Sequence, residues 1–345
     1  MATLVGGLEQ TGAQHTVDLD GAADDLTCYS FKLNSIHLNT YNVRVLERGR
    51  SVRVVDNLST GSLKNLEGLE QAYPGRFEFS ETDIRDRDAL DPLFEGASTV
   101  FHQAAMVSVQ KSVEDPGLCH DINVTGTLNV FQAARRTGVG KVVFASTCAV
   151  YGDDPELPKR EAMPAAPKSP YAASKYIDEV YAALFGDLYG FPIVALRYFN
   201  VFGPRQDPAS DYAAVIPKFI TRMLSGRTPI IFGDGEQTRD FIYVGNVVQA
   251  NFEAAEKAPA GAVMNIGTGR SYSLNQLVSI LNDVLTTTWR PQYGEARLGD
   301  VRHSRADVGL ASRLVDFVPP VSFEEGLKRT VEWFRTGEQA REDSE

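Results

Sequence analysis

The chain has 345 residues, of which 43% are hydrophobic and 23% charged, and its formal net charge is −11. This length allows one large or two modest domains with a buried core. The negative charge argues against a nucleic-acid or anionic-membrane partner, and no apolar run reaches the roughly 20 residues of a membrane-spanning helix. Cys28, Cys119 and Cys148 have no disulfide-framework or metal-ligand spacing. We therefore expect a cytoplasmic protein without a bound metal.

Helix and strand patterns alternate along the chain from about residue 43. Short apolar or alternating runs predict strands at 51–56, 76–79, 99–102, 141–145 and 193–197. Helical spacing of apolar residues predicts a helix that ends near residue 48, before Gly49, and further helices at 88–94, 123–137 and 171–188. This alternation predicts an α/β fold, with a parallel sheet covered by helices on both faces.

Proline and glycine become frequent after about residue 200, and the segments between them are short. This change predicts that the main domain covers residues 1–200 and that a smaller mixed region, 201–335, packs on it. Residues 239–248 and 264–267 are candidates for a return to the main sheet, and 336–345 form a polar tail. Ligands of parallel sheets bind at the carboxyl ends of the strands, which is where we expect the site.

Tyr171 and Lys175 stand four residues apart at the start of the predicted helix 171–188. Positions i and i+4 share a helix face, so the phenol and the ammonium group can point into one pocket. A phenol has a pKa of about 10 and is a poor base at neutral pH. A neighbouring cation favours the phenolate and lowers this pKa. The pair can therefore form a general base that removes a proton from an alcohol.

Further motifs accompany this pair along most of the chain. They are Asp56-Asn57, Asp83-Ile84, His102-Gln-Ala-Ala105, Ser146-Thr147, Arg197-Tyr-Phe-Asn200, Arg239-Asp-Phe and Asp300-Val-Arg302. With them, the chain from about residue 43 to residue 335 resembles the extended short-chain dehydrogenase/reductase family, and within it the nucleotide-sugar 4-epimerases. The resemblance implies a Rossmann-like doubly wound sheet that binds NAD in residues 1–200, of which 1–42 are atypical, and a mainly substrate-binding region at 201–335.

The resemblance also implies which residues hold a tightly bound NAD. Asp56 would accept hydrogen bonds from the adenosine ribose and would repel the 2′-phosphate of NADP. The other residues assigned to the cofactor are Gly6, Gly12, Asn57, Asp83, Ile84, Ala104, Ala105, Asn123, Ser146, Tyr171, Lys175 and Phe199. A competing interpretation stays open for two of them, because Asp83 and Asn123 are residue types that also cap helices.

By the same resemblance, Tyr171 takes the proton of the sugar 4′-hydroxyl while hydride passes from C4′ to NAD. Lys175 would hold the tyrosinate and the nicotinamide ribose, and Thr147, in place of the commoner serine, would bridge Tyr171 and the sugar oxygen. The 4-keto sugar then turns over, and the hydride returns to its other face. The residues assigned to the UDP-sugar are Thr147, Asn200, Ala214, Val215, Arg239, Asp300, Arg302 and Ser304.

Ser304 bears on the choice of sugar. In the family, a bulky aromatic residue at the matching position narrows the sugar pocket, whereas a small residue leaves room for a 2-acetamido group. Ser304 therefore favours interconversion of UDP-GlcNAc and UDP-GalNAc. UDP-glucose remains an alternative, and Arg302 and Arg305 keep a UDP-uronate open.

Further residues argue against an elimination reaction, and the resemblance also implies an oligomeric state. Cys148-Ala149 replaces the Asp-Glu pair of the related 4,6-dehydratases, so an elimination is not expected. We expect Cys148 to be a packed residue and His102 to be structural. Family members are usually dimers through helices that include the one with Tyr171, which implies a homodimer.

The glycine-rich loop of the family is altered in this chain. The nearest match, residues 5–12, keeps Gly6 and Gly12 but has Glu9 where a glycine lets the backbone approach the pyrophosphate. Asp56 follows Gly12 by 44 residues, where roughly 20 is typical. An insertion in 13–41, a frameshift and a decayed site all fit this pattern. The competing hypothesis is thus an inactive member that binds nucleotide sugars.

Overall fold

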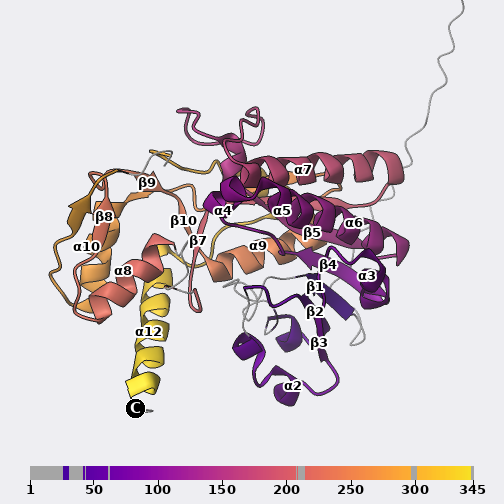
Figure 1. Ribbon diagram of the computed structural model, residues 1–345, viewed down its shortest axis with the longest axis horizontal. Helices are drawn as coiled ribbons and strands as arrows, with labels where there is room; N and C mark the ends of the chain where they lie inside the picture. The colour runs from indigo at the N-terminus through magenta and orange to yellow at the C-terminus, as the bar shows by residue number, and fades with distance from the viewer. Residues whose placement is uncertain are drawn as a thin grey trace, which may run out of the picture.

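The structure, a computed structural model, describes residues 26–30, 42, 44–60, 63–206, 208, 214–296 and 301–342. Within these residues, the centre of the molecule is a seven-stranded parallel sheet in the order β11-β6-β5-β4-β1-β2-β3 (Figure 1). The strands are β1 (Leu26–Ser30), β2 (Ser51–Asp56), β3 (Phe77–Glu81), β4 (Ala97–His102), β5 (Lys141–Thr147), β6 (Ile193–Tyr198) and β11 (Val263–Ile266). The strand order runs outward in both directions from β1 and β4, which confirms the predicted Rossmann-like doubly wound fold.

Helices cover both faces of this sheet. One face carries α3 (Arg87–Phe94), α6 (Gly126–Arg136) and α7 (Pro170–Tyr189). Phe94, Phe131 and Phe185 from these helices are buried against the strands. The other face carries α9 (Val244–Lys257) and α11 (Gly309–Val315), with η1 (Leu63–Leu66) and α2 (Leu69–Ala72) beside β2 and β3. Removal of this apolar surface from water is the main term that stabilises the layers.

The connection from β4 to α6 brings short helices alongside α7. It contains α4 (Val109–Glu114), α5 (Pro116–His120) and a π-helical segment, η2 (Asp121–Thr125). Figure 1 shows α4 and α5 lying along the start of α7, and all three segments contact that helix. The predicted helix 123–137 is thus divided between η2 and α6. A π-helical turn is rare and often marks a functional site.

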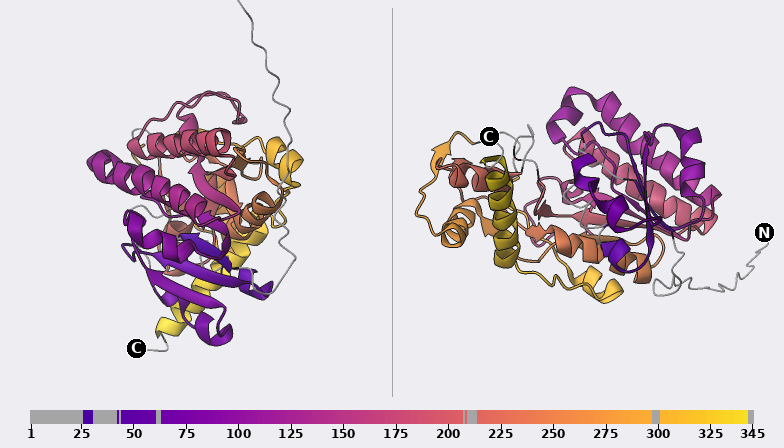
Figure 2. Two further views of the ribbon diagram at one scale, coloured as in Figure 1. Left: turned by 90° about the vertical axis from the view of Figure 1, so that its right-hand side faces the viewer. Right: turned by 90° about the horizontal axis from the view of Figure 1, so that it is seen from below.

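A smaller region extends from the end of β6. Its core lies between α8 (Val215–Leu224), α10 (Leu274–Leu285) and α12 (Phe323–Glu342). Three two-stranded sheets border it: β7 (Asn200–Phe202) with β10 (Phe241–Tyr243), β9 (Thr238–Arg239) with β12 (Tyr272–Ser273), and β8 (Ile230–Phe232) with β13 (Gln292–Gly294). Figures 1 and 2 show this region at one end of the molecule. In the described part of the chain, no helix is long and apolar enough to cross a membrane.

Two later segments, 239–248 and 264–267, were expected to return to the main sheet. β11 brings residues 263–266 back to the sheet, as predicted. The same prediction for residues 239–248 was wrong. β9 and β10 pair with strands outside the main sheet, and α9 packs against one face of that sheet.

β1 is a central strand that the sequence pattern did not predict. It pairs with β2 on one side and with β4 on the other. Its sequence, Leu-Thr-Cys-Tyr-Ser, lacks the continuous apolar run of a strand buried on both faces. Gly6 and Gly12 precede this strand and lie outside the described residues, so their contact with NAD stays a prediction. Residues 31–41, which follow β1 in the chain, contain no glycine.

Candidate active site

The carboxyl ends of β4, β5 and β6 meet at one edge of the sheet. β5 ends with Ser146 and Thr147, and Phe199 follows the last residue of β6. α7 begins beside this edge, since it contacts both β5 and the turn after it. Sequence motifs that are far apart in the chain are therefore brought together here, as expected for a parallel sheet.

The start of α7 is fixed by local interactions. Pro170 occupies its first position, where the missing N–H needs no partner. The Ser169 hydroxyl accepts a hydrogen bond of 3.1 Å from a backbone N–H of the first turn. The backbone N–H of Tyr171 donates to Ser112 Oγ at 3.1 Å, which ties α7 to α4. These contacts place Tyr171 in the first turn and Lys175, whose side chain is 2% exposed, one turn later.

The electrostatics of Tyr171 differ from the sequence-based expectation. Burial raises the pKa of its phenol to about 12 and outweighs the hydrogen bond with Thr147, which lowers this pKa. The Lys175 ammonium lies 3.4 Å from Asp178 Oδ2. No hydrogen bond between this ammonium and the phenol is present in the described part of the chain. The expectation that the cation lowers the Tyr171 pKa below its ordinary value is therefore wrong in this structure.

Asn123 lies in η2, and its amide joins two segments of the site. Its Oδ1 accepts a hydrogen bond of 2.6 Å from the Met106 N–H, and its Nδ2 donates to the Met106 carbonyl at 3.1 Å and to Ser174 Oγ at 2.9 Å. The helix-cap interpretation is wrong, because Asn123 lies inside η2, whose N-cap residue is His120. Asn123 instead links the loop after β4 to Ser174 on α7, the residue before Lys175.

The residues predicted for adenosine lie at the ends of β2 and β3. Asp56 is 2% exposed, and its Oδ1 accepts a hydrogen bond of 2.6 Å from the Leu58 N–H. Asn57 Nδ2 donates to Asp83 Oδ2 at 2.8 Å, which joins the two strand ends. Bonds from the Arg85 side chain are the main reason that the pKa of Asp83 falls to about 2. Asp83 does not cap α3, whose N-cap residue is Asp86.

Small residues follow β4, and another stands at the start of α6. Ala105, after β4, is buried and Ala104 is half-buried. Ile84 is buried against α6, and a Cβ added at Gly126 would lie 2.6 Å from Ile84 Cδ1. Glycine at 126 therefore allows α6 to approach Ile84 closely. The structure brings this predicted set together along the edge of the sheet.

Ser146 belongs to a buried network that the sequence did not reveal. Its Oγ donates to Glu179 Oε1 at 2.5 Å. Arg197 binds both oxygens of Glu179, Nε to Oε1 at 2.9 Å and a terminal nitrogen to Oε2 at 2.7 Å. The guanidinium also lies 4.8 Å from the centre of the Tyr151 ring. The network fixes the end of β5 to α7 and β6.

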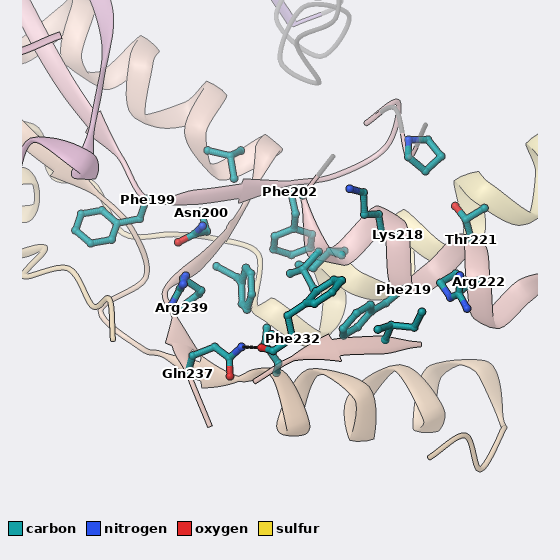
Figure 3. A pocket seen from close by; sticks show the side chains of 18 of the residues that line it. Phe199, Asn200, Phe202, Lys218, Phe219, Thr221, Arg222, Phe232, Gln237 and Arg239 are labelled. Carbon is teal, nitrogen blue, oxygen red and sulfur yellow. Dashed lines mark hydrogen bonds between the residues drawn. The ribbon is translucent and has the colours of Figure 1, made fainter. Parts of the chain in front are cut away.

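A cavity of about 760 Å³ opens beyond the end of β6 (Figure 3). Four residues predicted for the substrate line it, namely Asn200, Ala214, Val215 and Arg239, and so does Phe199, which was predicted for the cofactor. Sequence reasoning missed the other polar and aromatic lining residues, among them Lys218, Arg222, Arg227, Phe232 and Gln237. The signal for the cations was their spacing on and after α8, where Lys218 and Arg222 stand four residues apart.

The remaining predicted substrate residues lie beside this cavity or outside the described residues. Arg302 is exposed and forms a two-bond ion pair with Asp234, at 3.1 and 2.7 Å. Ser304 is 9% exposed, and its N–H donates to the Thr238 carbonyl at 3.0 Å. Asp300 lies outside the described residues, so its contact with the uridine ribose stays a prediction.

Cys148 and His102 have no proton to exchange near neutral pH. Burial raises the pKa of the Cys148 thiol to about 11, while a hydrogen bond from Ser304 acts in the opposite direction. Burial lowers the pKa of His102 well below its ordinary value, and the Lys175 charge adds to this effect. The His102 ring bonds Thr127 Oγ1 at 2.8 Å. These contacts agree with the expectation of a packed cysteine and a structural histidine.

The described residues fit a dinucleotide at both ends. Asp56 offers a carboxylate at the end of β2, and Lys175 offers a cation on α7, with small side chains at Ala104 and Ala105 between them. The segment that would bind the pyrophosphate lies outside the described residues. The donor and acceptor groups at the two ends therefore suit the adenosine ribose and the nicotinamide ribose respectively.

Comparisons with known proteins agree with this geometry. Residues 41–267 match the NAD dependent epimerase/dehydratase family. The chain is 40% identical over 298 residues to the UDP-glucose 4-epimerase of Mycolicibacterium smegmatis, covering 86% of this chain and 94% of the relative. Its structure is similar to that of UDP-N-acetylglucosamine 4-epimerase from Methanobrevibacter ruminantium in complex with UDP-N-acetylmuramic acid, with a TM-score of 0.85, 39% identity, and coverage of 91% of this chain and 99% of that chain.

A second solved structure, UDP-glucose 4-epimerase from Thermotoga maritima with UDP-glucose, gives a TM-score of 0.84 at 38% identity and covers 90% of this chain and 99% of that chain. The chain belongs to the NAD-dependent epimerase/dehydratase family. It is thus an enzyme, and its cofactor is NAD.

Proposed function

We propose that the chain is a UDP-sugar 4-epimerase that interconverts UDP-GlcNAc and UDP-GalNAc. Epimerisation at C4′ is the activity named for the similar proteins, and the choice of sugar rests on Ser304. This residue is nearly buried and its hydroxyl bonds the thiol of Cys148, the neighbour of Thr147 in the chain. A small side chain therefore stands beside the proposed reaction centre, which leaves room for a 2-acetamido group.

Tyr171, Thr147 and Lys175 supply the proton chemistry of this proposal. The deprotonated Tyr171 accepts the proton of the 4′-hydroxyl and returns a proton to that oxygen after the 4-keto sugar has turned over. The Thr147 hydroxyl, which bonds the phenol, can also contact the 4′-oxygen, because an alcohol both donates and accepts. Lys175 places a positive charge one helical turn away. NAD, when bound, accepts the hydride from C4′ and returns it.

The cavity beyond β6 is the proposed site for the UDP group. Arg239 and Asn200 would bind the diphosphate, since a guanidinium donates two charge-assisted hydrogen bonds to such a group. Ala214 and Val215, at the start of α8, would contact the uracil. Arg302 can join them only if it leaves Asp234.

The proposed function is tested by releasing bound nucleotide from the purified protein and by incubating the protein with UDP-GlcNAc. We expect NAD, and we expect UDP-GalNAc as the product in a chromatographic assay. A protein that neither contains NAD nor takes it up would support the inactive, sugar-binding alternative. Conversion of UDP-glucose without conversion of UDP-GlcNAc would leave the reaction intact and refute the choice of sugar.

Ser304→Tyr should distinguish acetamido sugars from plain hexoses. The added ring would fill the space proposed for the acetamido group, so kcat/KM for UDP-GlcNAc should fall at least about tenfold more than kcat/KM for UDP-glucose, in line with steric selection in pockets. Ser312→Tyr, at an exposed position on α11, serves as the control and should affect neither substrate. Equal losses with both sugars in Ser304→Tyr would refute the pocket argument.

Two other UDP-sugars are alternative substrates for the same 4-epimerisation. The relatives named UDP-glucose 4-epimerase favour UDP-glucose as the second candidate. A UDP-uronate is less well supported, because the Arg302 guanidinium that would bind a carboxylate is engaged by Asp234.

We also propose that the protein acts in the cytoplasm as a homodimer that pairs through α7. Tyr176, Val180, Leu184 and Leu188 repeat every four residues along this helix, and Val180 is 45% and Leu188 67% exposed. Val180→Asp combined with Leu184→Lys should convert a dimer to a monomer in light scattering, because both charges would be buried in the interface. Val318→Asp, at an exposed apolar residue outside α7, is the control, and an unchanged mass in the double variant would contradict this interface.

A further inference from the structure

Asp178 is a buried carboxylate to which the proposed reaction gives no role. It follows Lys175 by three residues on α7, and its side chain is 1% exposed. Its Oδ2 lies 3.4 Å from Lys175 Nζ, whereas its Oδ1 has no hydrogen-bond partner among the described residues. Buried polar atoms in proteins are almost always hydrogen-bonded, so such an oxygen calls for an explanation.

The other ionisable groups around Tyr171 carry little net charge. On the elements packed against α7, Cys119 and Cys148 have raised pKa values because of burial, and the lowered pKa of His102 keeps its ring neutral. Glu179 is paired with Arg197. The carboxylate that acts on the phenol is therefore Asp178, which lies 3.4 Å from the Lys175 ammonium.

We propose that Asp178 is a positioning residue that holds the Lys175 ammonium and offsets its charge, so that Tyr171 stays basic enough to accept the sugar proton. The proposal rests on the proposed function, in which Tyr171 is the base. Lys175 alone would favour the phenolate, but a strongly stabilised phenolate is a weak base and accepts the sugar proton less readily. Because the same group must take and return a proton in each turnover, a balanced charge beside it suits both steps.

The electrostatic effects in the site have the signs that this role requires. Burial is the main reason that the pKa of Tyr171 is raised, and the Asp178 charge acts in the same direction. Burial raises the pKa of Asp178 itself to about 7, against the opposing effect of Lys175. As the pH rises through about 7, Asp178 therefore becomes charged and the phenolate becomes less favoured.

Asp178→Asn tests the proposal, since it removes the charge and keeps the shape. The absorbance of the Tyr171 tyrosinate is obtained by subtracting the spectrum of Tyr171→Phe in each background. In Asp178→Asn, this absorbance should appear at a pH lower by about one unit than in the wild type. The acid limb of kcat should shift in the same direction, with KM for the sugar unchanged. Asp178→Glu, which keeps the charge, should restore the wild-type titration. Asp187→Asn removes the same charge from the exposed end of α7 and should change neither measurement.

A Tyr171 titration that is unchanged or raised in folded Asp178→Asn would overturn the proposal. If this variant does not fold, the wild-type protein decides the question: the Tyr171 ¹³Cζ resonance, assigned with Tyr171→Phe, should show an inflection near pH 7, and its absence would refute the coupling. Neither result depends on turnover. Retained epimerisation in Tyr171→Phe would instead refute the proposed function, so the two failures can be told apart.

Discussion

Replacement of Tyr171 by phenylalanine is expected to lower kcat for epimerisation by about 10²–10⁴-fold, the usual contribution of a positioned acid–base group. The variant loses the phenol oxygen, which bonds Thr147, but keeps the ring that fills the buried space. KM and the free energy of unfolding should therefore change little. The measurement is the initial rate with UDP-GlcNAc and with UDP-glucose, together with the amount of bound NAD.

The last residue of α7 supplies a matched control. Tyr189→Phe removes a hydroxyl from a side chain that is 53% exposed, so it should retain full activity. In the wild type, the rate should rise with pH on the acid side, because only the deprotonated phenol accepts a proton. Substantial activity in Tyr171→Phe, with the sugar and NAD still bound, would remove Tyr171 from its proposed role.

The elements that position the site were predictable because each carries a strong local signal. β5 is an apolar run that ends in Ser146-Thr147, and Pro170 marks the start of α7. Parallel strands place their carboxyl ends at one edge, so the proximity of Thr147 to the start of α7 followed from the predicted topology. The i, i+4 spacing then placed Lys175 on the same helix face as Tyr171.

Contacts between distant charged residues could not be predicted in this way. Helix spacing also allows Lys175 to pair with either Asp178 or Glu179. Only the packing of β5 and β6 against α7 shows that Asp178 binds Lys175 and Glu179 binds Arg197. The Tyr171 pKa was misjudged for the same reason, since burial and Asp178 are properties of the folded site. β1 was missed because its five residues lack an apolar run.

Glu179→Ala is expected to lower the free energy of unfolding by about 3–5 kcal/mol, the usual cost of leaving one partner of a buried ion pair uncompensated. The side chains of Arg197 and Glu179 are 6% and 4% exposed. Glu179 supplies both acceptors for the guanidinium and the acceptor for Ser146. One terminal nitrogen of Arg197 already has no partner among the described residues, so removal of the carboxylate would leave further guanidinium N–H groups without an acceptor.

Denaturant unfolding of Glu179→Ala, with the slope m compared to that of the wild type, measures this loss. Glu325→Ala breaks an exposed pair with Arg329 and should cost less than about 1 kcal/mol. The double replacement Glu179→Met with Arg197→Met removes both charges and should recover much of the stability, since apolar side chains can substitute for a buried ion pair. If the double variant is as unstable as Glu179→Ala, the loss comes from packing or from Ser146 rather than from the unpaired guanidinium.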